Sequence, residues 1–194
     1  MHVSSRWCVT ALLALGALGC SDPVAPPAQG AFVASVRTPS PRPDGTMCAG
    51  LPFTYDVPAV IERNPVEQLD QDTYKHKAVD GENGAAVSCS VKGGSTFTFS
   101  GDISAGVKAL RIEGSLGADL KGTARVTVVN AQLLSSPLAS PEANCVVNAA
   151  KGDGNNFQVK AGHIWASFDC PLVSAPPSEV CSAKGFFVLE NCEQ

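Results

Sequence analysis

The eight cysteines are the residues of this sequence that are best suited to covalent chemistry. Six of them follow residue 40, and an even set of this size in an exported chain typically forms disulfides. Zinc binding is the competing interpretation, but the sequence has no C-x-x-C pair and its histidines are unhelpfully spaced. The sequence therefore predicts three disulfides and no metal site. The six cysteines are Cys48, Cys89, Cys145, Cys170, Cys181 and Cys192.

The predicted strands limit how these cysteines can pair. Cys181 and Cys192 flank an expected strand at residues 184–189, so a rise of about 3.3 Å per residue places them too far apart to bond. Cys170 ends one expected strand and Cys181 begins the next. If the two strands form a hairpin, both cysteines lie at one end, and the Cys170–Cys181 pair is preferred. Three connectivities then remain for the other four cysteines, and the bond of Cys192 is expected to hold the chain end.

No catalytic constellation is evident in the sequence. The motifs G-x-S-x-G and H-E-x-x-H and the P-loop are all absent. His76 lies between two lysines in a polar stretch and His163 follows Gly162, so neither is a convincing general base. We therefore expect a non-enzymatic protein without catalytic residues. The alternative is a glycan-acting hydrolase that uses two carboxylates from distant strands, although no particular pair is indicated.

Trp165 is the one tryptophan that remains after the leader, and it shares a predicted strand face with His163. On an exposed sheet face the indole ring could stack on a sugar or a peptide, whereas a lone strand tryptophan is more often half-buried. Trp165 and His163 are thus a possible binding face, with packing as the other interpretation. The acidic stretch at residues 70–83 could bind calcium but is more typical of exposed turns.

Alternation of apolar and polar residues predicts a series of strands after residue 85. Phe97 and Phe99 lie on one face of their segment, and Val126 and Val128 do so in another. Gly-rich turns separate the segments, and no helical stretch is long enough for a βαβ crossover. The expected strands are residues 86–91, 96–100, 107–113, 123–130, 145–148, 157–160, 163–169 and 184–189. The sequence predicts an all-β fold, a single antiparallel β-sandwich or jelly-roll-like domain.

The first twenty residues carry an export pattern. Residues 1–6 contain one fixed positive charge, and residues 7–18 contain none. This pattern is typical of a secretory signal, and it is shorter than the roughly 20 apolar residues that span a bilayer. The small and apolar residues Ala17, Leu18 and Gly19 precede Cys20. This junction resembles the lipobox of bacterial lipoproteins.

The lipobox resemblance implies cleavage before Cys20, a diacylglycerol thioether on its sulfur and acylation of the new amino group. Such chains anchor stably in a membrane. In the sorting rule for these lipoproteins, Ser21 favours the outer membrane over the inner one. The alternative is an ordinary signal peptidase, whose small-x-small rule Ala17 and Gly19 also satisfy. Lipidation leaves six cysteines for disulfides, whereas an ordinary cut would leave an odd number.

Length and charge limit the possible domain organisation and the possible partners. The formal net charge is −4, and the sequence has no basic run, so nucleic acid is an unexpected partner. We expect residues 1–19 to be the signal peptide, the proline-rich residues 20–47 to be a tether, and residues 48–194 to be the domain. Within the tether, residues 31–36 are expected to form a short strand docked on the domain, with disorder as the alternative. The expected partners are the membrane and an envelope protein or glycan, with no cofactor.

Overall fold

The computed structural model describes residues 24–39, 48, 53–58, 76–150, 158–176 and 179–194. Regular structure in these residues consists of twelve β-strands. No described segment is a helix that could cross a membrane. The expected signal peptide, the expected lipid-attachment residue Cys20 and Ser21 lie outside the described residues.

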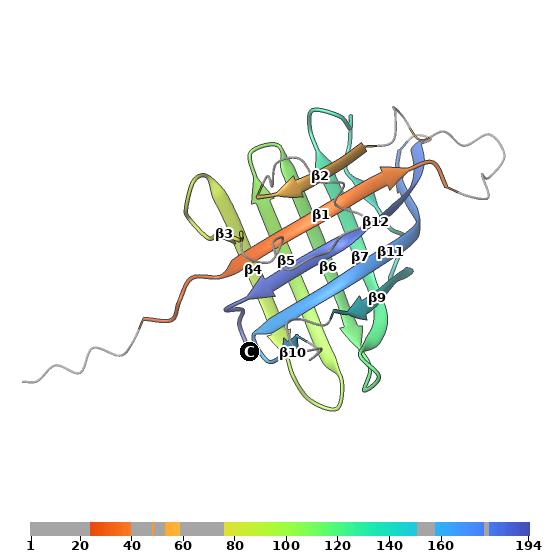
Figure 1. Cartoon of the computed structure of the whole chain (residues 1–194). Helices are drawn as coiled ribbons and strands as arrows, with labels where there is room; N and C mark the ends of the chain where they lie inside the picture. Colours follow the sequence, from red (N-terminus) through yellow and green to blue (C-terminus); the bar gives the residue numbers. More distant parts are fainter. Residues whose placement is uncertain (1–23, 40–47, 49–52, 59–75, 151–157, 177–178) are drawn as a thin grey trace, which may run out of the picture.

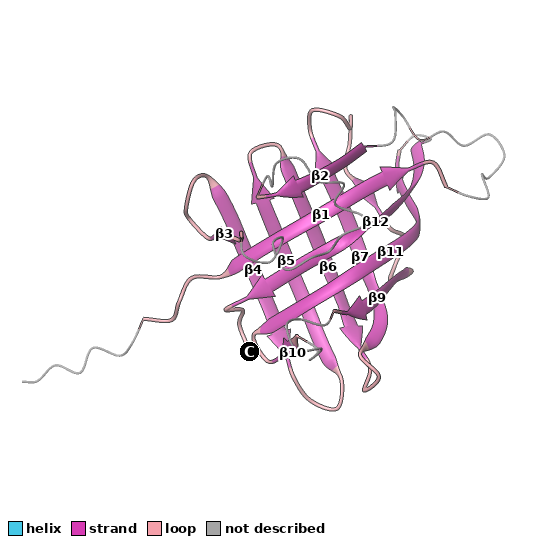
Figure 2. Ribbon diagram, in the orientation of Figure 1, coloured by secondary structure: helices cyan, strands magenta, loops and turns pink. Residues whose placement is uncertain are grey.

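Figure 2 shows the strands and the loops that join them. The strands are β1 (Gln29–Arg37), β2 (Phe53–Val57), β3 (Ala78–Val79), β4 (Ala85–Lys92), β5 (Phe97–Ala105), β6 (Lys108–Leu116), β7 (Lys121–Asn130), β8 (Leu138–Ala139), β9 (Cys145–Ala149), β10 (Val159–Lys160), β11 (His163–Ala175) and β12 (Glu179–Glu190).

The strands form two antiparallel layers, and β1, β12 and β11 run obliquely across β4 to β7 (Figure 1). Hydrogen bonding follows the order β2-β1-β12-β11-β8-β7-β6-β5-β4, so one sheet folds over to make both layers. The short strand β9 pairs with both β11 and β7 and closes one side. The fold is therefore a single all-β, antiparallel β-sandwich-like domain, as the sequence predicts.

The core lies between the layers and consists of the inward side chains of each strand. Phe99 on β5 faces Phe187 on β12, and their ring centroids are 5.6 Å apart. Ile103, Leu110 and Val126 are completely buried. Burial of one such side chain contributes roughly 1.5–3 kcal/mol, so this interior accounts for much of the stability of the fold.

The two layers are in close contact where β5 crosses β12. A Cβ atom on Gly101 would lie 2.6 Å from Cδ1 of Leu189. Gly185 is confined by a neighbouring strand of its own layer, because a Cβ atom there would lie 2.0 Å from the carbonyl oxygen of Val33 on β1. Only glycine fits at these two positions without displacing a neighbour.

All eight expected strands are present, but the N-terminal boundary is wrong. Strand β1 pairs with β12 on one side and β2 on the other, and seven of its nine residues are buried. Residues 29–37 are thus part of the domain, not of a tether at residues 20–47, and the domain does not begin at Cys48. The expectation that residues 31–36 form a strand docked on the domain is confirmed. The strands β2, β3 and β8 were not predicted.

Three disulfides are present, as predicted, and they join Cys48 to Cys181, Cys89 to Cys192 and Cys145 to Cys170. The expectation that the bond of Cys192 holds the chain end is confirmed. The third bond joins neighbouring strands, because β9 pairs with β11. The Cα atoms of Cys145 and Cys170 are therefore only 4.1 Å apart.

The preferred Cys170–Cys181 pair is wrong, although the two strands do form a hairpin. Strand β11 continues past Cys170 to Ala175, so both cysteines lie inside their strands and not at one end. The register places Cys170 opposite Ala183 and Cys181 opposite Val173. The longer strands thus separate the two cysteines along the hairpin.

Candidate functional site

The two residues of the expected binding face, Trp165 and His163, lie together on the outer face of β11. Alternation along the strand turns Ile164 and Ala166 into the core and leaves Trp165 and His163 on the opposite side. Their rings are stacked, with centroids 5.6 Å apart and an interplanar angle of 29°. The placement of both residues on one face is as the sequence indicates.

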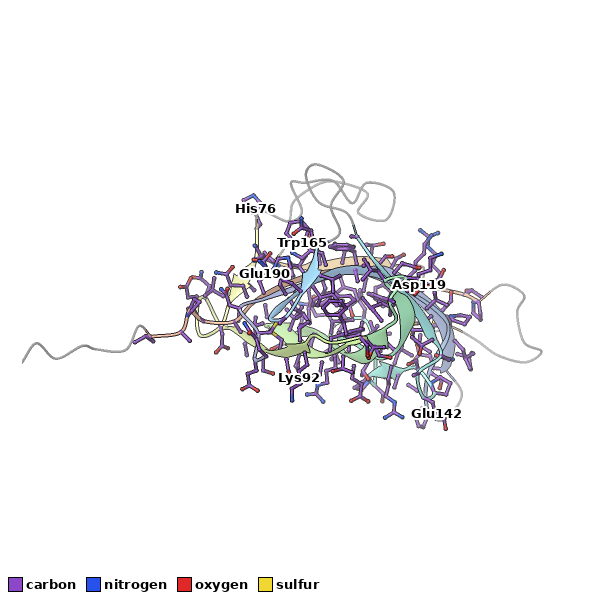
Figure 3. All side chains as sticks on the ribbon, turned by 90° about the horizontal axis from the view of Figure 1, so that it is seen from below. His76, Lys92, Asp119, Glu142, Trp165 and Glu190 are labelled. Atoms are coloured by element: carbon purple, nitrogen blue, oxygen red, sulfur yellow. A yellow bond between two sulfur atoms is a disulfide. The ribbon has the colours of Figure 1, made fainter. Side chains whose placement is uncertain are left out.

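Glu190 on β12 connects these two rings. It lies opposite His163 in the antiparallel register, and Trp165 donates a hydrogen bond of 2.8 Å from Nε1 to its Oε1. Nδ1 of His163 is 3.7 Å from the same oxygen, and Lys77 forms an ion pair with the other carboxylate oxygen. Figure 3 shows Trp165 and Glu190 on one side of the sandwich. We call these four residues the Glu190 cluster.

The sequence indicated only two members of the Glu190 cluster, Trp165 and His163, and not Glu190 or Lys77. Lys77 and Glu190 are 113 residues apart, and only the pairing of β1 with both β3 and β12 brings them together. Alternation along the last strand was the available signal, since it places Glu190 on the outer face. The residues that meet Glu190 from other strands could not be predicted without the strand order.

Burial decides the protonation of His163. It lowers the pKa of His163 below its ordinary value of 6.5, while the charge of Glu190 acts in the opposite direction and Lys160 and Lys77 lower the pKa further. Its Nε2 atom is buried and has no hydrogen-bond partner among the described residues. The imidazole is therefore neutral near pH 7, and its one unused nitrogen is closed to a substrate in solution.

Trp165 is half-buried and takes part in packing. Ala31, Phe186 and Val188 form a small buried cluster on the outer face of this layer, and Trp165 packs against it. The ring of Trp165 also stacks on His163, and Nζ of Lys77 lies 6.0 Å from its centroid. These contacts favour the packing interpretation of Trp165 over a stacking platform open to a sugar.

The opposite layer carries two adjoining hollows on its outer face. Their volumes are about 460 and 490 Å³, and both are bordered by Ser90, Ser100, Glu113 and Arg125. Together they extend over β4 to β7, and we call them the polar hollow. Figure 3 shows Lys92 projecting from this side, away from Trp165 and Glu190.

Cross-strand neighbours set the charge pattern of the polar hollow. Asp102 lies opposite Arg111, and Glu113 lies opposite Arg125. Arg111 Nε is 2.7 Å from Asp102 Oδ2, and Arg125 Nη1 is 3.3 Å from Glu113 Oε1. The two arginine side chains are 69% and 52% exposed, so their other N–H groups remain accessible to a ligand. Exposed pairs of this kind contribute about 0–1 kcal/mol to stability.

Two segments border the polar hollow at its ends. Glu193 contributes from the C-terminal segment beside β4, and Ala143 contributes from the loop before β9. The residues that line the polar hollow include Ser88, Ser100 and Thr127, whose side chains carry hydroxyl groups. Each hydroxyl can donate one hydrogen bond and accept others, so the surface suits a ligand that is rich in polar groups.

The carboxylates of the polar hollow do not resemble a glycosidase pair. Asp102 and Glu113 each have an arginine as an ion-pair partner. The two carboxylate side chains are also 37% and 62% exposed, whereas the general acid of a glycosidase typically lies in an apolar pocket. This arrangement gives no support to catalysis by the two acids.

The remaining candidates of the sequence are distributed over the surface. His76 is exposed, and the side chain of Asp80 accepts a hydrogen bond of 2.9 Å from the N–H of Val87. Asp80 therefore shapes the turn before β4, while Asp70 and Asp72 lie outside the described residues. In the described ranges no three potential metal ligands gather at one place.

Comparison with known protein families, curated proteins and solved structures finds no match for this chain. The described structure has two candidate binding surfaces, the Glu190 cluster and the polar hollow. At the Glu190 cluster the polar atoms bond mainly to one another, and the tryptophan packs against buried neighbours. The polar hollow is open, and a ligand can enter it without displacing a buried group.

Proposed function

We propose that this chain is a lipid-anchored protein of the bacterial cell envelope. The resemblance of residues 17–20 to a lipobox supports the anchor, and Ser21 supports the outer membrane as its place. The three disulfides are consistent with an extracytoplasmic location, because such bonds persist in oxidising compartments. Acylation of Cys20 also leaves every other cysteine of the mature chain with a disulfide partner.

The domain is a non-enzymatic binding module, and the polar hollow is its binding surface. The observation that carries this proposal is the set of hydroxyl and guanidinium groups that four adjacent strands hold in fixed register over the hollow. A glycan of the envelope presents hydroxyl and carboxylate groups that such donors and acceptors recognise. An envelope protein is the other candidate occupant of the same surface.

The anchor is tested by the intact mass of the chain isolated from bacterial membranes. We expect a product that begins at Cys20, carries two or three acyl chains and shows six thiols only after reduction. Cys20→Ser removes the acyl mass and releases the protein, whereas Cys8→Ser, in the expected signal peptide, leaves the product unchanged. A soluble, unlipidated wild-type product with an odd number of thiols contradicts the anchor.

Ligand binding is tested on the mature chain with Cys20→Ser, titrated with soluble fragments of envelope glycans. Arg111→Gln combined with Arg125→Gln is expected to weaken binding at least about tenfold, since each substitution removes charged hydrogen-bond donors. Lys184→Gln is the matched control, because this exposed cation lies on β12 in the other layer.

The result for both variants decides between the candidate functions. Equal binding by the two variants overturns the polar hollow as the site. Binding to an envelope protein but to no glycan identifies the other occupant. Release of shortened glycan, lost in Asp102→Asn or Glu113→Gln, would instead favour the hydrolase.

A further inference from the structure

The two parts of the polar hollow differ in charge. The part of about 460 Å³ is lined by three carboxylates and two guanidinium groups, and the part of about 490 Å³ is lined by two cations and one carboxylate. Both arginines pair with a carboxylate of a neighbouring strand. Two charges that border the hollow have no ion-pair partner among the described residues. They are Glu193 in the first part and Lys92 in the second.

The backbone of Glu193 is held firmly at the edge of the hollow. Its N–H donates to the carbonyl of Cys89 over 3.0 Å, and its carbonyl accepts the N–H of Val91 over 2.8 Å. The preceding residue, Cys192, forms a disulfide with Cys89. These contacts place Glu193 beside Ser90 in a short parallel bridge. The carboxylate therefore borders the hollow from a fixed position of the backbone.

Lys92 lies on the same face, two residues beyond Ser90 on β4. Figure 3 shows Lys92 projecting from this side of the sandwich. The spacings between and along β-strands place the Cα atoms of Lys92 and Glu193 about 8 Å apart. Both side chains are exposed, and no ion pair joins them in the described structure. A negative and a positive side chain thus flank Ser90, which borders both parts of the hollow.

This pair of charges suits a ligand group that carries both an ammonium and a carboxylate. The ammonium can donate hydrogen bonds to Glu193, and the carboxylate can accept them from Lys92. A group with only a negative charge would be repelled by Glu193, and a group with only a positive charge would be repelled by Lys92. An amino acid with a free amine and a free carboxylate has both groups within a few bonds of each other.

We propose that the ligand of the polar hollow is an envelope glycan with amino-acid substituents, whose ammonium binds Glu193 and whose carboxylate binds Lys92. This inference rests on the proposed function, because it names the class of glycan that the same surface takes. The sugar hydroxyl groups lie over Ser100 and Thr98, which are the neighbours of Ser90 and Lys92 on β5. The C-terminal segment therefore supplies part of the specificity of the site.

The test uses the mature chain with Cys20→Ser and soluble peptidoglycan fragments, in which a short peptide with a free amine and carboxylates is attached to a disaccharide. The second probe is the same fragment after acetylation of the amine, and the third is the peptide without its sugars. Acetylation is expected to weaken binding about two- to fivefold, because it removes one exposed charge pair. The peptide alone is expected to bind more weakly than the whole fragment, because it leaves the serine and threonine hydroxyl groups unused.

Variants assign the ammonium to its partner. Glu193→Gln is expected to abolish the difference between the free and the acetylated fragment. Lys92→Gln is expected to weaken the binding of both fragments and to keep the difference. The matched controls are Glu82→Gln and Lys184→Gln, since these exposed charges do not border the hollow, and both are expected to bind as the parent chain does.

The outcomes separate this inference from the proposed function. Equal binding of the free and acetylated fragments, still weakened by the two arginine substitutions, overturns the inference and leaves the hollow as a glycan site. A difference that persists in Glu193→Gln, or equal binding of the peptide without its sugars, also overturns the inference. If other envelope glycans bind and these fragments do not, the inference alone is overturned. Absence of binding to every glycan overturns both.

Discussion

Trp165 and Glu190 are joined across β11 and β12 by a hydrogen bond of 2.8 Å between the indole Nε1 and the carboxylate Oε1. The same carboxylate carries the ion pair to Lys77 and lies beside His163. Only 14% of the Glu190 side chain is exposed, so its polar contacts are mainly with these partners. Glu190 on β12 thus connects its own strand to β11, through Trp165 and His163, and to the start of β3, which directly follows Lys77.

Replacement of Glu190 tests this relationship. Glu190→Leu leaves the Trp165 N–H and the Lys77 ammonium without their acceptor in a half-buried place, and we expect a loss of about 2–4 kcal/mol in the free energy of unfolding. Urea unfolding followed by the fluorescence of Trp165 measures the loss. Glu113→Leu is the control, because its side chain is 62% exposed and an exposed pair contributes only about 0–1 kcal/mol. Similar losses in the two variants would show that burial of the Glu190 cluster adds nothing.

His163 predicts a dependence of stability on acid pH. Its pKa in the folded chain is lowered chiefly by burial, so the unfolded chain binds more protons as the pH falls below the ordinary value of 6.5. The free energy of unfolding therefore decreases from about pH 6.5 downward. His163→Gln is expected to flatten this slope, and His76→Gln, at an exposed position, is expected to leave it unchanged. A slope that is equal in all three proteins would contradict the assignment to His163.

The strands that the sequence predicted well have one buried and one polar face. Strand β6 is an example, since Leu110 and Ile112 are buried while Arg111 and Glu113 are exposed. Strand β1 does not show this alternation of apolar and polar residues, because it lies in the middle of its layer and is buried on both faces. Continuous burial produces an apolar run without alternation, and the prolines that follow it resemble a tether.

Pairs of residues that are distant in the sequence were beyond prediction. The Cys170–Cys181 pair looked plausible only because both strands were taken to be shorter than they are. The polar hollow depends on which strands are adjacent, since Asp102 and Arg111 meet only through the register of β5 with β6. Alternation tells which face a residue occupies, and the sheet order tells which residues share that face.

The close approach of the two layers predicts a strong effect of a small substitution. Gly101→Ala adds a methyl group that would overlap the side chain of Leu189, and we expect a loss of about 1–3 kcal/mol in stability. Gly94→Ala is the control, because the nearest atom to its added Cβ would be 3.5 Å away, an ordinary contact. Thermal unfolding of both variants measures the difference. Equal melting temperatures would mean that Leu189 can move aside freely.

The disulfides differ in how much of the unfolded chain they restrict. The bond between Cys48 and Cys181 closes 133 residues, and the bond between Cys145 and Cys170 closes 25. In the chain-entropy description these loops correspond to about 5 and about 3.5 kcal/mol. Removal of the longer link is therefore expected to be the more destabilising change, although the shorter link lies between two fully buried cysteines.

Paired alanine substitutions measure this difference. Cys48→Ala with Cys181→Ala and Cys145→Ala with Cys170→Ala each remove two thiols, so the change in composition is matched. Urea unfolding at equilibrium is expected to show the larger loss for the first pair, by about 1.5 kcal/mol. A larger loss for the second pair would mean that packing around Cys145 and Cys170 outweighs the restriction of the unfolded chain. The linkage of β9 to β11, which closes one side of the sandwich, would then be the dominant contribution of the disulfides to stability.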